Sequence, residues 1–167
     1  METINKPLSV FLVDDDKMFL VSLKHKLLEQ FKNIKFSVFS TGEECLKNID
    51  EKPDIIVLDY YMNSEMPDAM NGIQVLRKIQ AISEDIKVIM LSAQDKLDIA
   101  VDSIKYGAYE YVVKSETAFI RLQNTIKNLL NDVAFNKETK KYEVWNYVVG
   151  IAFLLLLLLD LWYYLKR

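Results

Sequence analysis

Two apolar runs of the chain end in carboxylates. Ser9–Val13 is followed by Asp14 and Asp15, and Ile55–Leu58 is followed by Asp59. Short apolar runs rich in β-branched residues predict strands that are buried on both faces, as in a parallel sheet covered by helices. Such sheets bind their ligands beyond the carboxyl ends of the strands. A single aspartate there is most often only solvated, so a functional interpretation depends on the residues at the ends of the other strands.

Two further runs end in a hydroxyl and a cation. Ser92 follows Lys87–Leu91, and Lys114 follows Tyr109–Val113. In a parallel sheet these two groups meet the three carboxylates at one rim. Clustered carboxylates repel one another, and a divalent cation that prefers oxygen ligands, such as Mg²⁺, relieves the repulsion. One carboxylate is then available as a nucleophile, while the lysine and the hydroxyl hold other oxygens of a phosphoryl group, so the combination favours in-line phosphoryl transfer.

Helical apolar patterns alternate with these strands, and Leu97, Val101 and Ile104 mark the fourth helix. Five alternations of strand and helix predict an α/β fold with a doubly wound, five-stranded parallel sheet of the flavodoxin-like (βα)5 type. The predicted strands are Ser9–Val13, Ile34–Ser40, Asp54–Asp59, Lys87–Leu91 and Tyr109–Val113. The dipeptide Asn71-Gly72, before the third helix, predicts a turn.

Composition excludes several classes of protein. At 167 residues the chain holds one ordinary domain and little else. A formal net charge of −3 gives no basic surface for nucleic acid, so we expect no nucleic-acid partner. The single cysteine, Cys45, excludes an intrachain disulfide framework and fits a reducing compartment.

The C-terminal segment has a different composition. Between Val144 and Leu165 the only strongly polar residues are Asn146 and Asp160, and aromatic residues lie near both ends. A helix of this length spans about 33 Å, which matches a hydrocarbon core of about 30 Å. The sequence therefore predicts a single transmembrane helix over 144–165 after a polar linker over 134–143. A buried core helix and an interfacial helix are the alternatives.

Together, the residues at the strand ends resemble the response-regulator receiver domain of two-component signalling. The resemblance covers about Pro7 to Asn131 and predicts a receiver domain over 1–133. Any one of its motifs alone would be weak, but their order along the chain is specific. The motifs are Leu-Val-Asp14-Asp15-Asp16, Ile-Val-Leu-Asp59, Met-Leu-Ser92-Ala93 and Tyr111-Val-Val-Lys114.

The resemblance implies a metal-assisted phosphoacceptor. Asp59 would take the phosphoryl group from the histidine of a histidine kinase or of a phosphotransfer protein. Asp15, Asp59 and the backbone carbonyl of Tyr61 would hold Mg²⁺, and Asp14 would act through a metal-bound water. The adjacent Asp16 is not expected to be a ligand.

The resemblance also implies a switch. Lys114 and Ser92 would bind the phosphoryl oxygens, and the side chain of Tyr111 would follow the movement of Ser92. Their motion would remodel a surface that an unknown downstream protein recognises. On this interpretation the chain is a signalling protein and not an enzyme.

Two features depart from the family pattern. Ser115 stands after Lys114 where family members usually have a proline in a cis bond, so we expect a trans bond here and a differently aimed lysine. The loop Tyr60–Asn71 is several residues longer than usual. Met62 occupies the expected methionine position, and Met66-Pro67 repeats the dipeptide farther on.

Three functions remain open at this point. The first is a membrane-anchored, single-domain response regulator, single-pass in the inner (cytoplasmic) membrane with its receiver domain in the cytoplasm. The second is a receiver-like scaffold that recruits a partner to the membrane without switching. The third is another enzyme or a flavin protein. A haloacid-dehalogenase-type phosphatase requires an aspartate at the position of Tyr61. Flavin binding requires a glycine- or hydroxyl-rich phosphate loop after the first strand, where Asp14–Lys17 is acidic.

Overall fold

A single parallel sheet organises the protein. The computed structural model describes residues 7–62, 69–93 and 95–166, of which 133–144 and most of 153–166 are described by their backbone alone. Within these residues five strands pair in the order β2-β1-β3-β4-β5. The strands are β1 (Leu8–Val13), β2 (Ile34–Phe39), β3 (Ile55–Asp59), β4 (Lys87–Ser92) and β5 (Glu110–Val113). The predicted five-stranded parallel sheet is therefore confirmed.

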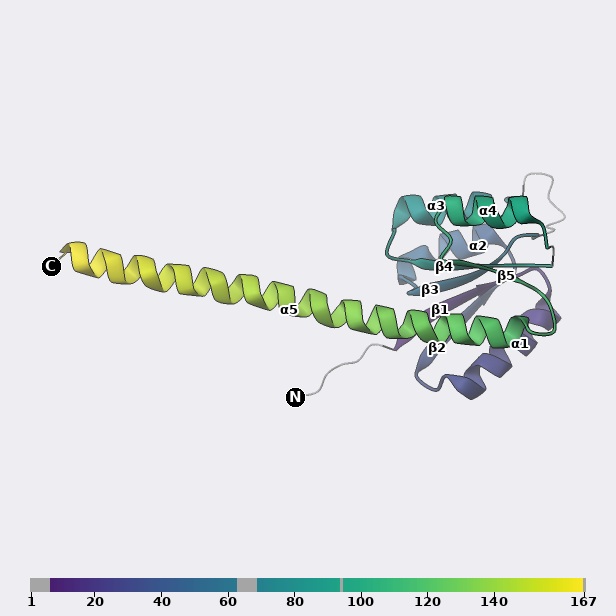
Figure 1. Cartoon of the computed structure of the whole chain (residues 1–167), viewed down its shortest axis with the longest axis horizontal. Coiled ribbons are helices and arrows are strands. Elements are labelled where there is room, and N and C mark those ends of the chain that lie inside the picture. The colour runs from purple at the N-terminus through teal and green to yellow at the C-terminus, as the bar shows by residue number, and fades with distance from the viewer. Residues whose placement is uncertain (1–6, 63–68, 94, 167) are drawn as a thin grey trace. The chain divides into compact units, whose positions relative to one another are not determined.

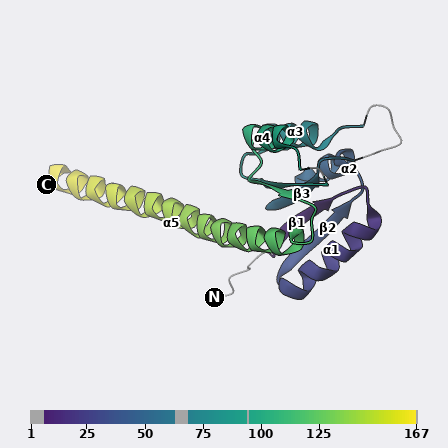
Figure 2. The same ribbon diagram turned by 45° about the vertical axis from the view of Figure 1, so that its right-hand side comes forward.

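Helices cover both faces of this sheet. They are α1 (Lys17–Gln30), α2 (Gly42–Lys47), the short 3₁₀ helix η1 (Ile49–Glu51), α3 (Gly72–Ile82), α4 (Leu97–Lys105) and α5 (Ala118–Lys166). Figure 1 shows α2, α3 and α4 on one face and α1 with the first turns of α5 on the other, and the turned view of Figure 2 shows the same two layers. Every residue of β3 is buried, as a strand between two helical layers requires.

The order of the strands decides which strand ends become neighbours. β1 and β3 lie side by side, with Val13 paired to Leu58, so the residues that come next, Asp14 and Asp59, also lie side by side. On the other side of β3, Asp59 pairs with Leu91, the residue before Ser92. The register of the strands therefore places the functional residues next to one another along one rim of the sheet.

Helix α1 begins within the acidic segment. Asp16 is its N-cap, and the Oδ1 atom accepts hydrogen bonds from the backbone N–H groups of Met18 at 2.9 Å and Phe19 at 3.0 Å. An aspartate in this position satisfies N–H groups that lack a partner within the helix, and its charge suits the positive end of the helix dipole.

Helix α3 begins one residue after Asn71. The Asn71 side chain accepts from the backbone of Gln74, and the Gln74 side chain accepts from the backbone of Asn71, which together form a capping box. The predicted turn at Asn71-Gly72 is therefore wrong. Asparagine favours turns and N-caps alike, because in both its side chain accepts a backbone hydrogen bond close by.

Helix α4 exposes the apolar residues that predicted it. Leu97, Val101 and Ile104 are all more than half exposed, while the buried residues of α4 are Ile99 and Ser103. The Ser103 hydroxyl donates to the Ile99 carbonyl oxygen at 2.7 Å, which satisfies it inside the protein. Helical spacing alone predicts a helix, but it does not decide which of two stripes faces the sheet.

Helix α5 is continuous from Ala118 to Lys166 and includes the residues predicted to be a linker, 134–143. The chain divides into two compact units, Met1–Leu129 and Leu130–Arg167. The transmembrane helix predicted over 144–165 finds no support. A spanning helix needs about 20 predominantly apolar residues, and no helix qualifies among the residues that the structure describes.

Candidate functional site

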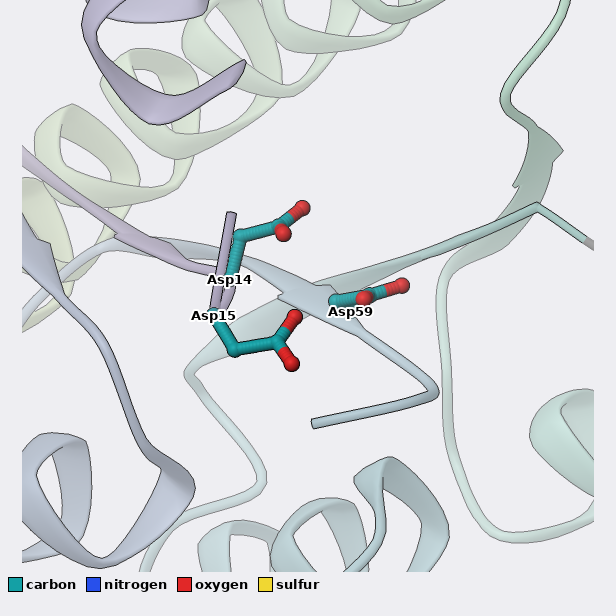
Figure 3. A group of neighbouring side chains, drawn as sticks. All are labelled: Asp14, Asp15 and Asp59. Carbon is teal, nitrogen blue, oxygen red and sulfur yellow. The ribbon is translucent and has the colours of Figure 1, made fainter. Parts of the chain in front are cut away.

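Three carboxylates gather at the carboxyl ends of β1 and β3, as the sequence predicts. Asp14, Asp15 and Asp59 each offer one oxygen, and these oxygens lie within 4.8 Å of one another. Figure 3 shows the three side chains as neighbours at the ends of the two strands. Asp14 is only 2% exposed and Asp59 only 4%. Hard oxygen donors this close together fit a divalent cation, so the residues present suit a metal ion.

Lys114 points directly into this acidic group. Its Nζ atom lies 2.6 Å from Oδ2 of Asp14 and 3.1 Å from Oδ2 of Asp59. Its backbone N–H donates to the Ser92 carbonyl oxygen at 2.7 Å, which fixes the end of β5 against β4. The bond between Lys114 and Ser115 is trans, as expected. Across this trans bond the ammonium reaches both carboxylates, and a different aim of Lys114 stays a prediction.

Burial and mutual repulsion perturb the acids. Burial and the charge of Asp14 raise the pKa of Asp59 to about 6, although the ammonium of Lys114 opposes the shift. Burial likewise raises the pKa of Asp14 despite its hydrogen bond with Lys114. Burial alone would lower the pKa of Lys114, but its hydrogen bond with Asp14 and the charges of Asp59 and Asp14 outweigh that effect and raise it. The site therefore holds one cation between two carboxylates that ionise with difficulty.

Ser92 and Tyr111 lie together on neighbouring strands. Ser92 is fully buried at the end of β4, and Tyr111 is 8% exposed in β5. Burial raises the pKa of Tyr111, and a hydrogen bond with Ser92 opposes the shift. The two residues expected to move together are thus already in contact.

The segment after Asp59 is held by its backbone. The N–H of Tyr60 donates both to Oδ1 of Asp59 at 2.8 Å and to the Leu91 carbonyl oxygen at 3.0 Å. The ring of Tyr61 packs edge-on against that of Tyr60, with centroids 4.5 Å apart. Metal binding by the Tyr61 carbonyl stays a prediction, and Met66-Pro67 lies outside the described residues.

The sequence analysis gave no role at the site to three residues that lie near it. The N–H of Asp16 donates to Oδ1 of Asp14 at 3.0 Å, so the helix cap also orients a site carboxylate. A Cβ on Gly72 would lie 2.5 Å from the Asp59 carbonyl oxygen, so only glycine fits there. The ring of Phe19 lies under the Lys114 ammonium. An aspartate just before an apolar helical pattern is an N-cap signal that would have identified Asp16, whereas the other two contacts join residues far apart in sequence.

Comparison with known proteins identifies the domain. The family model described as the response regulator receiver domain matches residues 10–127. The chemotaxis protein CheY of Listeria monocytogenes is 37% identical over 107 residues, which are 62% of this chain and 83% of that protein. The transcriptional regulatory protein PrrA of Mycobacterium leprae is 35% identical over 106 residues, 63% of this chain but only 42% of PrrA. The chain thus spans less than half the length of PrrA.

Solved structures agree on the fold. The signal receiver domain of a putative Luxo repressor protein from Vibrio parahaemolyticus superposes with a TM-score of 0.69 at 25% identity, covering 79% of this chain and 96% of that one. A response regulator receiver domain protein from Clostridium thermocellum gives a TM-score of 0.65 at 29% identity, over 77% of this chain and 98% of that one.

Proposed function

The chain belongs to the family of response regulator receiver domains, and from this membership we infer that it accepts a phosphoryl group on Asp59. The donor would be the phosphorylated histidine of a histidine kinase or of a phosphotransfer protein. One observation carries the proposal: the buried carboxylate that ends the central strand β3 lies beside Asp14 and 3.1 Å from the ammonium of Lys114. A carboxylate in such surroundings is a nucleophile with charge compensation already in place.

The transfer would proceed in line. An oxygen of Asp59 attacks phosphorus while the bond between phosphorus and the donor histidine nitrogen breaks, and the nitrogen keeps the electron pair. The N–H of Tyr60, donating to Oδ1, orients the carboxylate for attack. Lys114, now shared between two carboxylates, would turn to the phosphoryl oxygens and compensate their charge.

The acidic group would also hold the metal. Asp15, Asp59 and the Tyr61 carbonyl would bind Mg²⁺ directly, and Asp14 would bind it through water. A bound Mg²⁺ supplies positive charge to the phosphoryl oxygens, which carry most of the charge of the transition state.

Phosphorylation would change what the protein binds. Ser92 would bind a phosphoryl oxygen, and its contact with Tyr111 would transmit the change to the surface formed by α4, β5 and α5. The protein would act as an acceptor and switch for an unknown downstream protein, and not as an enzyme. A scaffold that does not switch is the competing function.

Mass spectrometry of the intact protein distinguishes the two. The full chain is incubated with Mg²⁺ and a small phosphodonor such as acetyl phosphate, beside Asp59→Asn. We expect the parent protein alone to gain one phosphoryl group, and excess chelator to abolish the gain. No gain in the parent, with unchanged folding, would favour the scaffold. An equal gain in Asp59→Asn would place the acceptor elsewhere.

The proposal extends to attachment at the inner (cytoplasmic) membrane, with the receiver domain in the cytoplasm where a kinase is supplied with ATP. Only the amino-acid sequence supports this part, through the apolar residues of Val144–Leu165 and their flanking aromatic residues. Flotation with lipid vesicles tests it by comparing the full chain with residues 1–132. Equal flotation of both, or of neither, would contradict membrane attachment by this segment.

A further inference from the structure

The ammonium of Lys114 has a third partner besides the two carboxylates. Its Nζ atom lies 4.7 Å from the centroid of the Phe19 ring, within the distance at which a cation is attracted to the face of an aromatic ring. Phe19 is the third residue of α1 and is partly exposed. The ring of Phe19 therefore adds an aromatic contact to the two ion pairs of the Lys114 ammonium.

Lys114 needs such a partner because its own segment restrains it little. Its backbone is anchored to Ser92, but four flexible methylene groups separate that anchor from the charge. The next residue, Ser115, is exposed and continues the chain through an ordinary trans bond. The position of the ammonium is thus decided by what surrounds it, namely two carboxylates and one ring.

Phe19 is itself held by the acidic segment. Its backbone N–H donates to Oδ1 of Asp16 at 3.0 Å, and the N–H of Asp16 donates to Oδ1 of Asp14 at 3.0 Å. The same short segment therefore supplies a site carboxylate, caps α1 and sets the ring beside the lysine.

We propose that Phe19 is a positioning residue for the phosphoryl-transfer site, because its ring keeps the Lys114 ammonium at the Asp59 carboxylate. This inference rests on the proposed function. Loss of the ring would let the flexible side chain sample positions in solvent, and fewer molecules would be ready to compensate the incoming phosphoryl charge. The rate of phosphoryl gain would fall while the fold and the carboxylates stay unchanged.

The test distinguishes the effect of the aromatic face of Phe19 from the effect of the volume of its side chain. Phe19→Leu and Phe19→Met keep an apolar side chain but lose the aromatic face, whereas Phe19→Tyr keeps both. The matched control is Phe119→Leu, since the ring of Phe119 lies 5.3 Å from the Nζ atom of Lys26 in the same kind of contact away from the site. We expect Phe19→Leu and Phe19→Met to gain the phosphoryl group from acetyl phosphate about threefold to tenfold more slowly, as loss of one cation–π contact implies. Phe19→Tyr and Phe119→Leu should react at the parent rate.

A second measurement does not depend on phosphorylation. In protein labelled with ¹³C-lysine, the ε-methylene resonances of Lys114, assigned with Lys114→Met, should be shifted by the ring current of Phe19. We expect that shift to vanish in Phe19→Leu and to persist in Phe19→Tyr. A parent that shows the shift but gains no phosphoryl group would refute the proposed function, and with it an effect of Phe19 on the rate. A parent rate in Phe19→Leu and Phe19→Met, or a fall in Phe19→Tyr equal to theirs, would overturn the inference about Phe19 alone.

Discussion

Asp14 and Asp59 are almost completely buried, although a buried carboxylate is costly to ionise. Burial and the charge of Asp14 raise the pKa of Asp59 to about 6 even with Lys114 beside it, so Lys114 offsets only part of that cost. The ionised Asp59 beside Asp14 therefore lowers the stability of the fold. Functional sites commonly contain groups whose pKa is perturbed in this way.

The first prediction concerns Asp59 and pH. With chelator present, we expect Asp59→Asn to be more stable than the parent at about pH 7.5, by about 3 kcal/mol at most, since one pKa unit is about 1.4 kcal/mol. The folded pKa of about 6 lies above the ordinary 3.8, so the folded protein binds this proton more tightly than the unfolded chain. Ionised Asp59 therefore destabilises the fold increasingly as pH rises from 3.8 to about 6, and fully above that. Denaturant unfolding at several pH values measures this difference.

The stability advantage of Asp59→Asn should shrink as the pH falls through the same range, because the parent carboxylate becomes protonated. If the variant is less stable than the parent at every pH, the ion pair with Lys114 outweighs the cost of burying the charge.

The second prediction concerns the metal. We expect excess Mg²⁺ to stabilise the parent, by about 2.7 kcal/mol at a hundredfold excess over Kd, because a cation that binds only the folded state adds its binding free energy. Thermal unfolding with Mg²⁺ and with chelator measures the effect. In Asp15→Asn the stabilisation should be much smaller, since one of the two carboxylates proposed to bind the ion directly is gone. Equal stabilisation of both proteins would place the metal elsewhere.

At the scale of elements, the site depends on how β3 meets α3. The N–H of Gly72 donates to the Tyr60 carbonyl oxygen at 2.9 Å, so the first residue of α3 is tied to the residue after the acceptor. A Cβ on Gly72 would meet backbone on two sides, 2.5 Å from the Asp59 carbonyl oxygen and 2.8 Å from the Tyr60 Cα. Backbone yields less readily than a flexible side chain, so this contact is intolerant of substitution.

The third prediction is that Gly72→Ala destabilises the protein by about 1–3 kcal/mol, as overpacking of a tight site does, and slows phosphoryl gain. Thermal unfolding and the intact-mass assay measure the two effects. Gly150→Ala is the matched control, because a Cβ there meets nothing within 4 Å and alanine favours the helix. A Gly72→Ala variant with parent stability and parent rate would show that α3 can move away from Asp59 at no cost.

At the scale of the whole molecule, the described core lies within one of the two compact units. The last buried apolar side chain among the described residues is Leu129, and the first unit ends at the same residue. Within α5, Leu122, Ile126 and Leu129 are each at most 1% exposed, so this part of the helix belongs to the core of the receiver fold.

The fourth prediction concerns that boundary. We expect residues 1–132 to keep the thermal unfolding temperature and the phosphoryl gain of the full chain. Residues 1–121 should fail to fold cooperatively, because removing three buried side chains costs several kcal/mol each. Calorimetry of both truncated proteins tests this. If residues 1–132 lose several kcal/mol of stability, residues beyond 132 contribute to the fold.

The amino-acid sequence by itself determined the elements of the site. Asp14, Asp59, Ser92 and Lys114 can be identified because each lies at or directly after the end of a strand, and parallel strands present their carboxyl ends at one rim whatever their order. The sequence likewise predicted the alternation of strand and helix, and the bounds of the five strands to within one residue, since these depend on residues close together along the chain.

Only the tertiary structure decided the rest. The strand order places β1 beside β3, and so Asp14 beside Asp59. The packing of the helices on the sheet leaves the stripe of Leu97, Val101 and Ile104 exposed, and it brings Phe19 into contact with Lys114. Helical spacing is the same for a buried stripe and an exposed one, and contacts between residues far apart in the chain arise only when the layers pack. The residues at the strand ends could therefore be predicted from local sequence pattern. The residues that contact and orient them depend on how the helices and the sheet pack.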